Sequence, residues 1–160
     1  MAKTIDQELK QTRPIRSAHE QAVLSLMRTS RAIEESWLLY LKRTESISIS
    51  QYNILRILRG ARPDRVKSSD IADRMIYRDP DVTRLVDRMV QQGLVRRDRD
   101  SDDRRIVLVS ITEDGLAMLE RLDDPVERYT AAVMAGLSPQ KLRELCVLLD
   151  QVRAGIRPFP

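Results

Sequence analysis

The sequence is poor in the residues from which catalytic and metal sites are most often built. Its 160 residues include one cysteine, one histidine and five glycines. One cysteine cannot form an internal disulfide, and one histidine cannot supply half of an ordinary zinc site. The sequence also has no phosphate-binding loop and no nucleophile motif. These absences argue against an enzyme, and we expect neither a metal nor a cofactor.

Long apolar runs are also missing. None approaches the roughly 20 residues that a membrane-spanning helix requires, and the N-terminal string MAKTIDQELKQTRP lacks the apolar core of a secretory signal. Apolar residues make up 42% of the chain and charged residues 32%, a balance that fits neither a disordered chain nor a membrane-embedded one. We therefore expect one compact domain, or one domain with long flanking helices, in the cytoplasm.

Apolar residues recur at three- and four-residue steps on both sides of a central segment, which predicts amphipathic helices. Residues 1–16 are polar and predict an arm or a short helix without a core of its own. Ser48 is a good N-cap and Gly60 a good C-terminal stop, so a helix is expected between them. Further helices are predicted over residues 17–43, from Thr112 onward with an interruption at Pro125, and from Ser138 and Pro139 toward the C-terminus.

The central segment itself predicts two short helices. Ser68 or Ser69 caps the first of them. Asp79 followed by Pro80 begins the second, since the carboxylate accepts backbone N–H groups and proline suits the first turn. This second helix runs to about Gln92. The residues expected to face inward on it are Val82, Leu85, Val86 and Met89.

A charged β-hairpin is predicted after the helix pair. The strings LVRRDRD and RRIVLVSIT flank an acidic turn, and the apolar residues of the second string alternate as those of a strand do. A helix pair followed by such a hairpin is the layout of a winged helix-turn-helix, whose dominant use is to read double-stranded DNA. The expected fold class is mainly α with a small β-hairpin. The expected boundaries are 1–46 for an N-terminal arm and dimerisation helix, 47–112 for the DNA-binding core and 113–160 for C-terminal dimerisation helices.

The flanking helices each carry an apolar stripe that must be covered. They either meet the same stripes of a second copy or fold back as a bundle within a monomer. We favour the dimer, because a second copy supplies a second DNA half-site about one helical turn away.

Charge is distributed unevenly around the predicted hairpin. From Asp79 to Arg105 the chain has seven arginines and seven aspartates, so this segment is neutral although the whole chain has a net charge of +4. One interpretation is that carboxylates hold the arginines in position to contact DNA. The other is that the segment is a solvated, salt-bridged turn. The preceding stretch, from Arg56 to Lys67, has five basic residues against Asp64 alone. That cluster suits contact with DNA phosphates.

Three strings, ISISQYNILRIL, SSDIADRM and DPDVTRLVDRMVQQGLVRRDRDSDDRRIVLVSITEDG, resemble the MarR family of bacterial transcriptional regulators. The resemblance covers roughly Ile47 to Gly115. It implies a homodimer whose N- and C-terminal helices form the interface, with each winged lobe on one half-site of a pseudo-palindromic operator. The leading hypothesis is therefore a sequence-specific DNA-binding regulator that acts as a repressor. The alternative is a winged-helix module that binds protein and no operator.

The resemblance also assigns roles to individual residues. The helix predicted from Pro80 to about Gln92 enters the major groove, and Arg105, preceded by Asp103, reaches into the minor groove. Asp87 occupies the position that braces this arginine in related proteins. The predicted DNA-binding residues are Ser68, Ser69, Asp81, Thr83, Arg84, Arg88, Asp103, Arg104 and Arg105.

Members of this family often bind a small aromatic or phenolic ligand between the dimer helices and the DNA-binding lobe, which weakens operator binding. The candidate lining residues here are Arg16, Trp37, Tyr40 and Tyr52. Aromatic residues at helical spacing also fit an ordinary core. The peroxide-sensing branch has a reactive cysteine near its N-terminus, which this chain lacks, and Cys146 is expected to pack.

Overall fold

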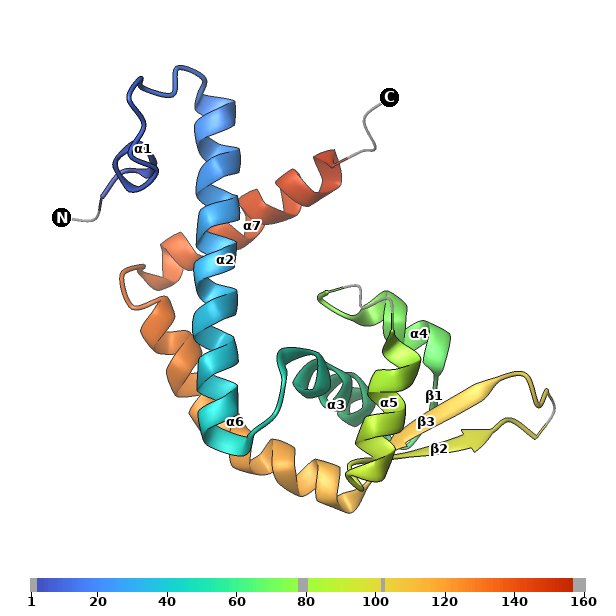
Figure 1. Cartoon of the computed structure of the whole chain (residues 1–160). Coiled ribbons are helices and arrows are strands. Elements are labelled where there is room, and N and C mark those ends of the chain that lie inside the picture. The colour runs from blue at the N-terminus through green and yellow to red at the C-terminus, as the bar shows by residue number, and fades with distance from the viewer. Residues whose placement is uncertain (1–2, 78–80, 102, 157–160) are drawn as a thin grey trace. The chain divides into compact units, whose positions relative to one another are not determined.

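The computed structural model describes residues 3–77, 81–101 and 103–156 (Figure 1). These residues form helices and one small antiparallel sheet, which confirms the predicted fold class. They fall into two compact units, Met1–Leu119 and Glu120–Pro160. The elements in chain order are α1 (Ile5–Glu8), α2 (Ala18–Glu45), α3 (Ile49–Ala61), β1 (Val66–Lys67), α4 (Ser68–Arg74), α5 (Val82–Gln91), β2 (Val95–Arg99), β3 (Val107–Ile111), α6 (Glu113–Val133) and α7 (Pro139–Gly155).

The two helices before the central segment begin at side-chain caps. In α2 the Ser17 hydroxyl accepts a hydrogen bond from the backbone N–H of Glu20 at 3.4 Å. In α3 the hydroxyl of Ser48 accepts from the N–H of Gln51, whose side chain in turn accepts from the N–H of Ser48. Both predicted helices are confirmed. The predicted stop at Gly60 is wrong, because Gly60 does not take the left-handed conformation of a C-terminal glycine and α3 continues to Ala61.

The start of α4 differs from the prediction that Ser68 or Ser69 caps it. Ser68 is already the first helical residue, and Lys67 holds the N-cap position without a side-chain cap. The reason is β1, in which Val66 pairs with Val109 and Lys67 with Leu108. Two residues are too few to produce an alternating pattern, so the sequence did not reveal this strand.

Helix α5 runs from Val82 to Gln91, and all four residues predicted to face inward on it are buried. Asp79 and Pro80, predicted to begin the helix, lie outside the described residues. Within the described part, Asp81 holds the N-cap position. After the helix, Gly93 takes a φ of +73°, which suits glycine because it has no Cβ.

The three strands form a sheet in the order β1-β3-β2, with both pairs antiparallel. Arg97 of β2 lies opposite Val109 of β3, and Val95 lies opposite Ile111. Since side chains alternate across a strand, Arg97 shares a face with the buried Val95. The predicted hairpin is confirmed, and one face of it is turned toward the protein core.

The beginning of α6 is fastened to the base of the hairpin. The Thr112 hydroxyl donates to the carbonyl oxygen of Gly93 at 2.6 Å and accepts from the N–H of Gly115 at 3.1 Å. A Cβ on Gly115 would lie 2.3 Å from the carbonyl oxygen of Leu94. The close approach of α6 to the hairpin therefore requires glycine at this position.

The second unit contains the rest of α6 and all of α7. Helix α6 continues through Pro125, so it does not restart there, and a bend at this proline stays a prediction. Helix α7 begins as predicted, with the Ser138 hydroxyl accepting from the N–H of Lys141 at 3.3 Å. No residue of α7 is buried. Its large exposed apolar side chains are Val147, Leu148 and Val152, followed by Ile156 at its C-cap.

Candidate nucleic-acid interface

The buried residues of α5 determine which of its side chains face solvent. Leu85 and Met89 are almost fully buried, whereas Thr83, Arg84 and Arg88 are exposed. In Figure 1 this helix lies beside the hairpin formed by β2 and β3. Because a helix is rigid, burial of one face holds the polar face in a fixed orientation. The exposed face of α5 is thus presented next to the hairpin.

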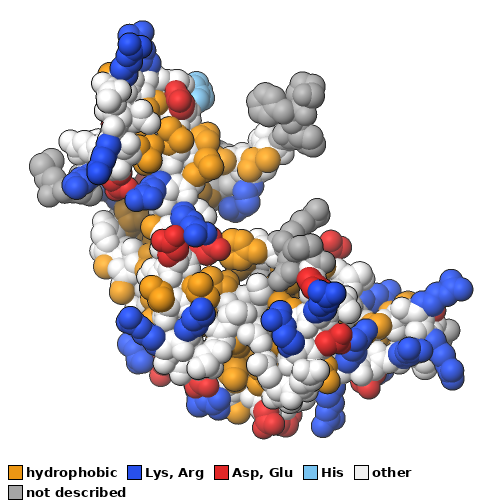
Figure 2. All heavy atoms as spheres, viewed as in Figure 1, with side chains coloured by type: hydrophobic (Ala, Val, Ile, Leu, Met, Phe, Trp, Pro, Cys, Tyr) orange, Lys and Arg blue, Asp and Glu red, His pale blue; other side chains and the backbone are white. Residues whose placement is uncertain are grey.

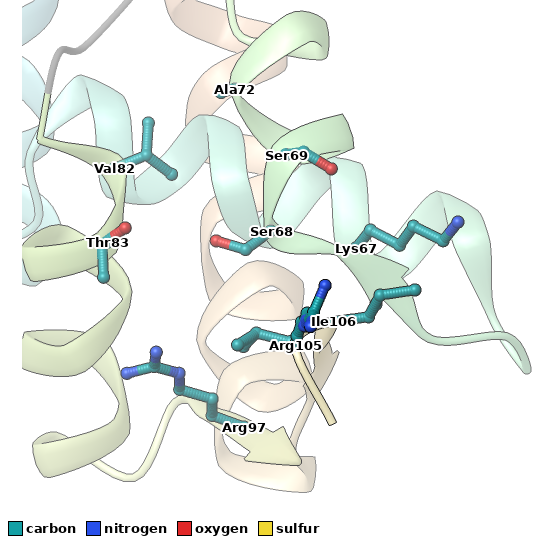
Figure 3. Close-up of a pocket in the computed structure, with 10 residues that line it drawn as sticks. Lys67, Ser68, Ser69, Ala72, Val82, Thr83, Arg97, Arg105 and Ile106 are labelled. Atoms are coloured by element: carbon teal, nitrogen blue, oxygen red, sulfur yellow. The ribbon is translucent and has the colours of Figure 1, made fainter. Parts of the chain in front are cut away.

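A groove of about 590 Å³ lies where α4, α5 and the hairpin meet (Figure 3). Figure 3 shows Val82 and Thr83 across from Ser68, with Arg97 and Arg105 at the hairpin side. Four of the nine predicted DNA-binding residues line this groove, namely Ser68, Ser69, Thr83 and Arg105. The full lining consists of Lys67, Ser68, Ser69, Ala72, Val82, Thr83, Arg97, Arg105, Ile106 and Val107.

The charge of this groove is of one sign. Its cations are Lys67, Arg105 and Arg97, of which Arg97 pairs with Asp87 outside the lining, and its described lining contains no acidic side chain. The Ser68 and Thr83 hydroxyls add further hydrogen-bond donors, while the Ser69 hydroxyl donates to the Asp70 carboxylate at 3.0 Å. Arginine, lysine and hydroxyl groups are the side chains that commonly contact DNA phosphates. The groove is therefore chemically suited to a phosphate backbone.

Asp87 joins α5 to the hairpin. Its carboxylate accepts a hydrogen bond from the Arg97 guanidinium, and the two form an ion pair. The resemblance implied Arg105 as the braced arginine, whereas the structure gives Arg97 this contact. The reason lies in the register, because Arg97 is on the core face of β2 while Arg105 lies in the turn before β3. The brace acts on the strand of the hairpin.

Asp103 organises the tip of the hairpin through backbone hydrogen bonds. Its carboxylate accepts from the N–H of Arg105 at 2.9 Å, and its carbonyl oxygen accepts from the N–H of Ile106 at 2.9 Å. The N–H of Asp103 in turn donates to the Asp100 carboxylate at 3.2 Å. These bonds shape the turn and leave Arg104 and Arg105 exposed. Figure 2 shows the resulting group of basic side chains at the hairpin end of the molecule.

A second hollow, of about 430 Å³, lies on the other side of α5 and collects the remaining predicted residues of that helix. Its lining consists of Asp81, Arg84, Asp87, Arg88 and Gln91. Here Oδ2 of Asp81 is 3.2 Å from Nη1 of Arg84, one turn along the helix. Unlike the groove, this surface carries both signs of charge.

The basic stretch before α4 is less unbalanced in space than in sequence. Arg62 lies 3.7 Å from a Glu113 oxygen, and Arg65 lies 3.8 Å from an Asp98 oxygen. Arg56 donates to the Tyr52 hydroxyl at 3.0 Å. Of the five basic residues in this stretch, Lys67 is the one that lines the groove.

The candidate ligand residues are only partly brought together. Trp37 and Tyr52 meet edge to face with ring centroids 6.0 Å apart, while Tyr40 lies half-buried further along α2. Arg16 lies before the start of α2, whereas Trp37 is about 28 Å further along that helix. Within one chain, Arg16 therefore cannot join the aromatic group.

Among the described residues, the phenol of Tyr77 has a pKa above its ordinary value. Burial raises the pKa of Tyr77, and the nearby Glu34 carboxylate raises it further. The Tyr77 phenol accordingly stays uncharged at neutral pH. Tyr77 follows α4 and Glu34 belongs to α2. Their electrostatic interaction therefore joins the long helix α2 to the segment between α4 and α5.

Features of other protein classes are sparse in the described part of the chain. No helix among these residues combines the length and the apolarity needed to cross a membrane. Across residues 3–77, 81–101 and 103–156, no group of three histidine, cysteine or acidic side chains is arranged to hold a metal. Cys146 is exposed on α7, so the expectation that it packs is wrong for this chain.

Arg97 is the residue of this site that sequence reasoning missed. It lines the groove and pairs with Asp87. The signal for it was strand alternation, since Val95 and Arg97 must share a face once the hairpin is accepted. On this face Arg97 lies next to α5, where Asp87 provides an anionic partner.

Comparison with known proteins gives consistent matches. The model of the MarR family matches residues 47–107. The homoprotocatechuate degradative operon repressor of Escherichia coli is 26% identical over 133 residues, which cover 83% of this chain and 88% of that protein.

Solved structures extend the similarity to most of the chain. The MarR transcription factor of Planctomyces limnophilus is 37% identical, with 86% of this chain and 99% of that one covered and a TM-score of 0.63. The MarR family regulator Sco3205 of Streptomyces coelicolor, solved in complex with DNA, is 22% identical, with coverage of 89% and 94% and a TM-score of 0.78. The fold is accordingly that of winged helix proteins.

Proposed function

The chain belongs to the MarR family of DNA-binding transcriptional regulators, and from this premise we propose that it represses transcription as a homodimer bound to a pseudo-palindromic operator. The observation that carries the proposal is the groove between α4, α5 and the hairpin, to which Lys67 and Arg105 bring positive charge and whose described lining residues include no acid. A bacterial operator lies in the cytoplasm, which is where the protein would act. The relative from Escherichia coli, itself named as an operon repressor, supports repression over activation.

In this proposal α5 enters the major groove. Thr83, Arg84 and Arg88 are exposed on it and contact base edges or the flanking phosphates, and Asp81 stands at its beginning. The Ser68 and Ser69 hydroxyls bind phosphate from the side of α4. The hairpin tip follows the adjacent minor groove, where Arg104 and Arg105 reach the DNA from the turn that Asp103 shapes. Asp87 contributes indirectly by holding the hairpin through Arg97.

The second copy is proposed because long apolar surfaces are exposed on the helices outside the DNA-binding core. Figure 2 shows hydrophobic side chains along α2 at the surface. In α2 the exposed ones include Val23, Met27 and Leu39. Helix α7 has three more, Val147, Leu148 and Val152, and Ile156 follows at its C-cap. Exposed apolar side chains that gather on a helix mark an interaction site. A two-fold dimer would cover it and place two copies of α5 on successive major grooves.

Footprinting of the purified protein on the DNA upstream of its own gene tests operator binding. The protected fragment then serves as the probe in anisotropy titrations of the wild type, Arg105→Ala and Arg128→Ala. Arg128 is exposed on α6, outside the groove, so its loss controls for net charge. We expect Arg105→Ala to lose operator binding while remaining a folded dimer, and Arg128→Ala to bind as the wild type does. Equal affinity of all three would exclude the hairpin from DNA contact.

The salt dependence of the same titrations separates a DNA regulator from a protein-binding module. Contacts to several phosphates release counterions, so the observed affinity should fall steeply as salt is raised. A flat response, together with no footprint, would favour the module that binds protein.

We also propose that a small aromatic or phenolic ligand weakens operator binding, supported by the contact between Trp37 and Tyr52 and by the half-buried Tyr40. Arg16 would reach such a ligand only from the second copy. Quenching of the single tryptophan by simple hydroxybenzoates is the direct test. Quenching that leaves operator affinity unchanged would separate binding from regulation.

A further inference from the structure

The N-cap position of α5 carries a negative charge where the proposed function brings the helix to DNA, and this inference rests on that function. Asp81 holds the N-cap position, yet its carboxylate makes no capping hydrogen bond. Its Oδ2 atom lies 3.2 Å from Nη1 of Arg84, and the two side chains are 49% and 83% exposed. Both therefore reach the solvent side of the helix.

The packing of α5 keeps this pair outward. Val82 and Leu85 are buried beside it and prevent the helix from rotating about its axis. Positions 81, 84, 88 and 91 follow steps of three and four residues, so they lie in one row. The other acid of this helix, Asp87, is committed to Arg97 of the hairpin. Asp81 and Arg84 lie together in the row of side chains that the proposed function brings to the base edges.

A carboxylate in the major groove can discriminate between bases, because it cannot bind those that offer only hydrogen-bond acceptors. An ionised carboxylate only accepts hydrogen bonds. Cytosine offers an amino donor in the major groove and adenine offers one beside N7, whereas guanine and thymine offer only acceptors there. Opposite guanine or thymine, the carboxylate would lose its water without gaining a donor. Such an unfavourable contact excludes wrong sequences, which is a common route to specificity.

Arg84 has the opposite preference. Its guanidinium can donate two parallel hydrogen bonds to O6 and N7 of guanine. The 3.2 Å contact places this donor directly beside the Asp81 acceptor. We infer that Asp81 is a specificity-determining residue, which with Arg84 selects operator half-sites that have a guanine beside a cytosine or adenine amino group. Its charge also lowers affinity for DNA of any other sequence, because it repels phosphates.

The substitution Asp81→Asn separates these two effects. An asparagine side chain both donates and accepts, so it should tolerate bases that the carboxylate rejects. We expect affinity for random-sequence DNA to rise about threefold at low salt, since one repulsive charge is removed. Discrimination at the contacted base pair should fall by about tenfold. Affinity and specificity thus change in opposite directions.

The test is binding-site selection from a duplex library with randomised half-sites, using the full-length wild type, Asp81→Asn and Asp73→Asn. Asp73 is exposed on α4, so its substitution removes the same charge outside the row on α5. Melting temperature and elution volume confirm that each variant is folded. We expect the wild type and Asp73→Asn to enrich one motif containing the guanine and its neighbouring amino base. Asp81→Asn should lose the preference at the amino-base position alone.

Two results would overturn the inference. They differ in whether the proposed DNA-binding function is overturned as well. If Asp81→Asn enriches the same motif as the wild type, the inference fails while the proposed function stands. If the wild type enriches no motif, sequence-specific DNA binding fails and the inference fails with it.

Discussion

At the scale of single residues, the ion pair between Asp87 and Arg97 is the link between the helix and the hairpin that the proposed function requires. The Asp87 side chain is 45% exposed and that of Arg97 is 36% exposed, so solvent screens the pair and its contribution to folding is below about 1 kcal/mol. Its importance lies in position, because it relates two elements that would contact one DNA duplex. A residue of this kind affects binding more than stability.

A double-mutant cycle tests this positioning role. Asp87→Ala and Arg97→Ala should each reduce operator affinity by about tenfold, and the double variant should lose little more, a coupling of about 1 kcal/mol. The Asp87→Ala variant is the more informative one, because removal of a negative charge alone would strengthen binding to DNA. Affinity is measured by anisotropy and stability by urea denaturation. Additive losses would show that the pair does not act as a unit.

At the scale of elements, the start of α6 depends on the absence of a side chain. Gly115 brings α6 against the backbone of Leu94, and Thr112 bonds to Gly93 across the same junction. Helix α5 ends just before Gly93, so α6, the hairpin and the end of α5 converge within a few residues. A shift of α6 at this junction would be transmitted to the DNA-binding elements.

Two glycine substitutions with opposite expected signs test the junction. Gly115→Ala should destabilise the fold by about 1–3 kcal/mol, because its Cβ would overlap the Leu94 carbonyl oxygen. Gly60→Ala is the matched control, since no atom lies within 4 Å of its Cβ and the site is helical. It should stabilise the fold by about 0.5–1 kcal/mol. Denaturant midpoints give both values, and a neutral Gly115→Ala would show that the junction can open.

A helix or strand can be predicted from the sequence only when it is long enough to show a repeated pattern of apolar residues. Repeated apolar spacing predicts helix α5 and the hairpin. The N-cap residues Ser48 and Ser138 predict where their helices begin. Strand β1 has two residues and no pattern, so it was missed, and with it the true start of α4. The separation of Arg16 from Trp37 is invisible until the intervening helix is known to be continuous. The partner of Asp87 required the strand register.

At the scale of the whole molecule, exposed apolar side chains on α2 and α7 are the feature that a single chain leaves unexplained. Leu148 is 58% exposed and Ile156 73% exposed, whereas most large apolar residues of the DNA-binding core are buried and Ile76 is an exposed exception. A monomer would keep these surfaces in water, at a cost of about 25 cal/mol for each Å² of apolar area. This contrast supports the proposed second copy.

The substitution Leu148→Asp tests the dimer. A charge at this exposed site should not disturb the fold of one chain, but it would be unpaired if the surface is buried against a second copy. We expect light scattering to report a dimer for the wild type and a monomer for the variant, with operator binding weakened. Arg143→Asp, exposed on the same helix, controls for added negative charge. A wild type that is monomeric at micromolar concentration would contradict the proposal.

The pairing of arginines with nearby acids also affects how the protein would locate its operator in a genome. Arg62, Arg65 and Arg84 each lie beside a carboxylate, which reduces the long-range attraction of the lobe for the phosphates of random DNA. Retention on the vast excess of other genomic sites depends on that attraction. Each copy would therefore stay only briefly on the wrong site, and a larger share of the cellular pool would remain available for the operator.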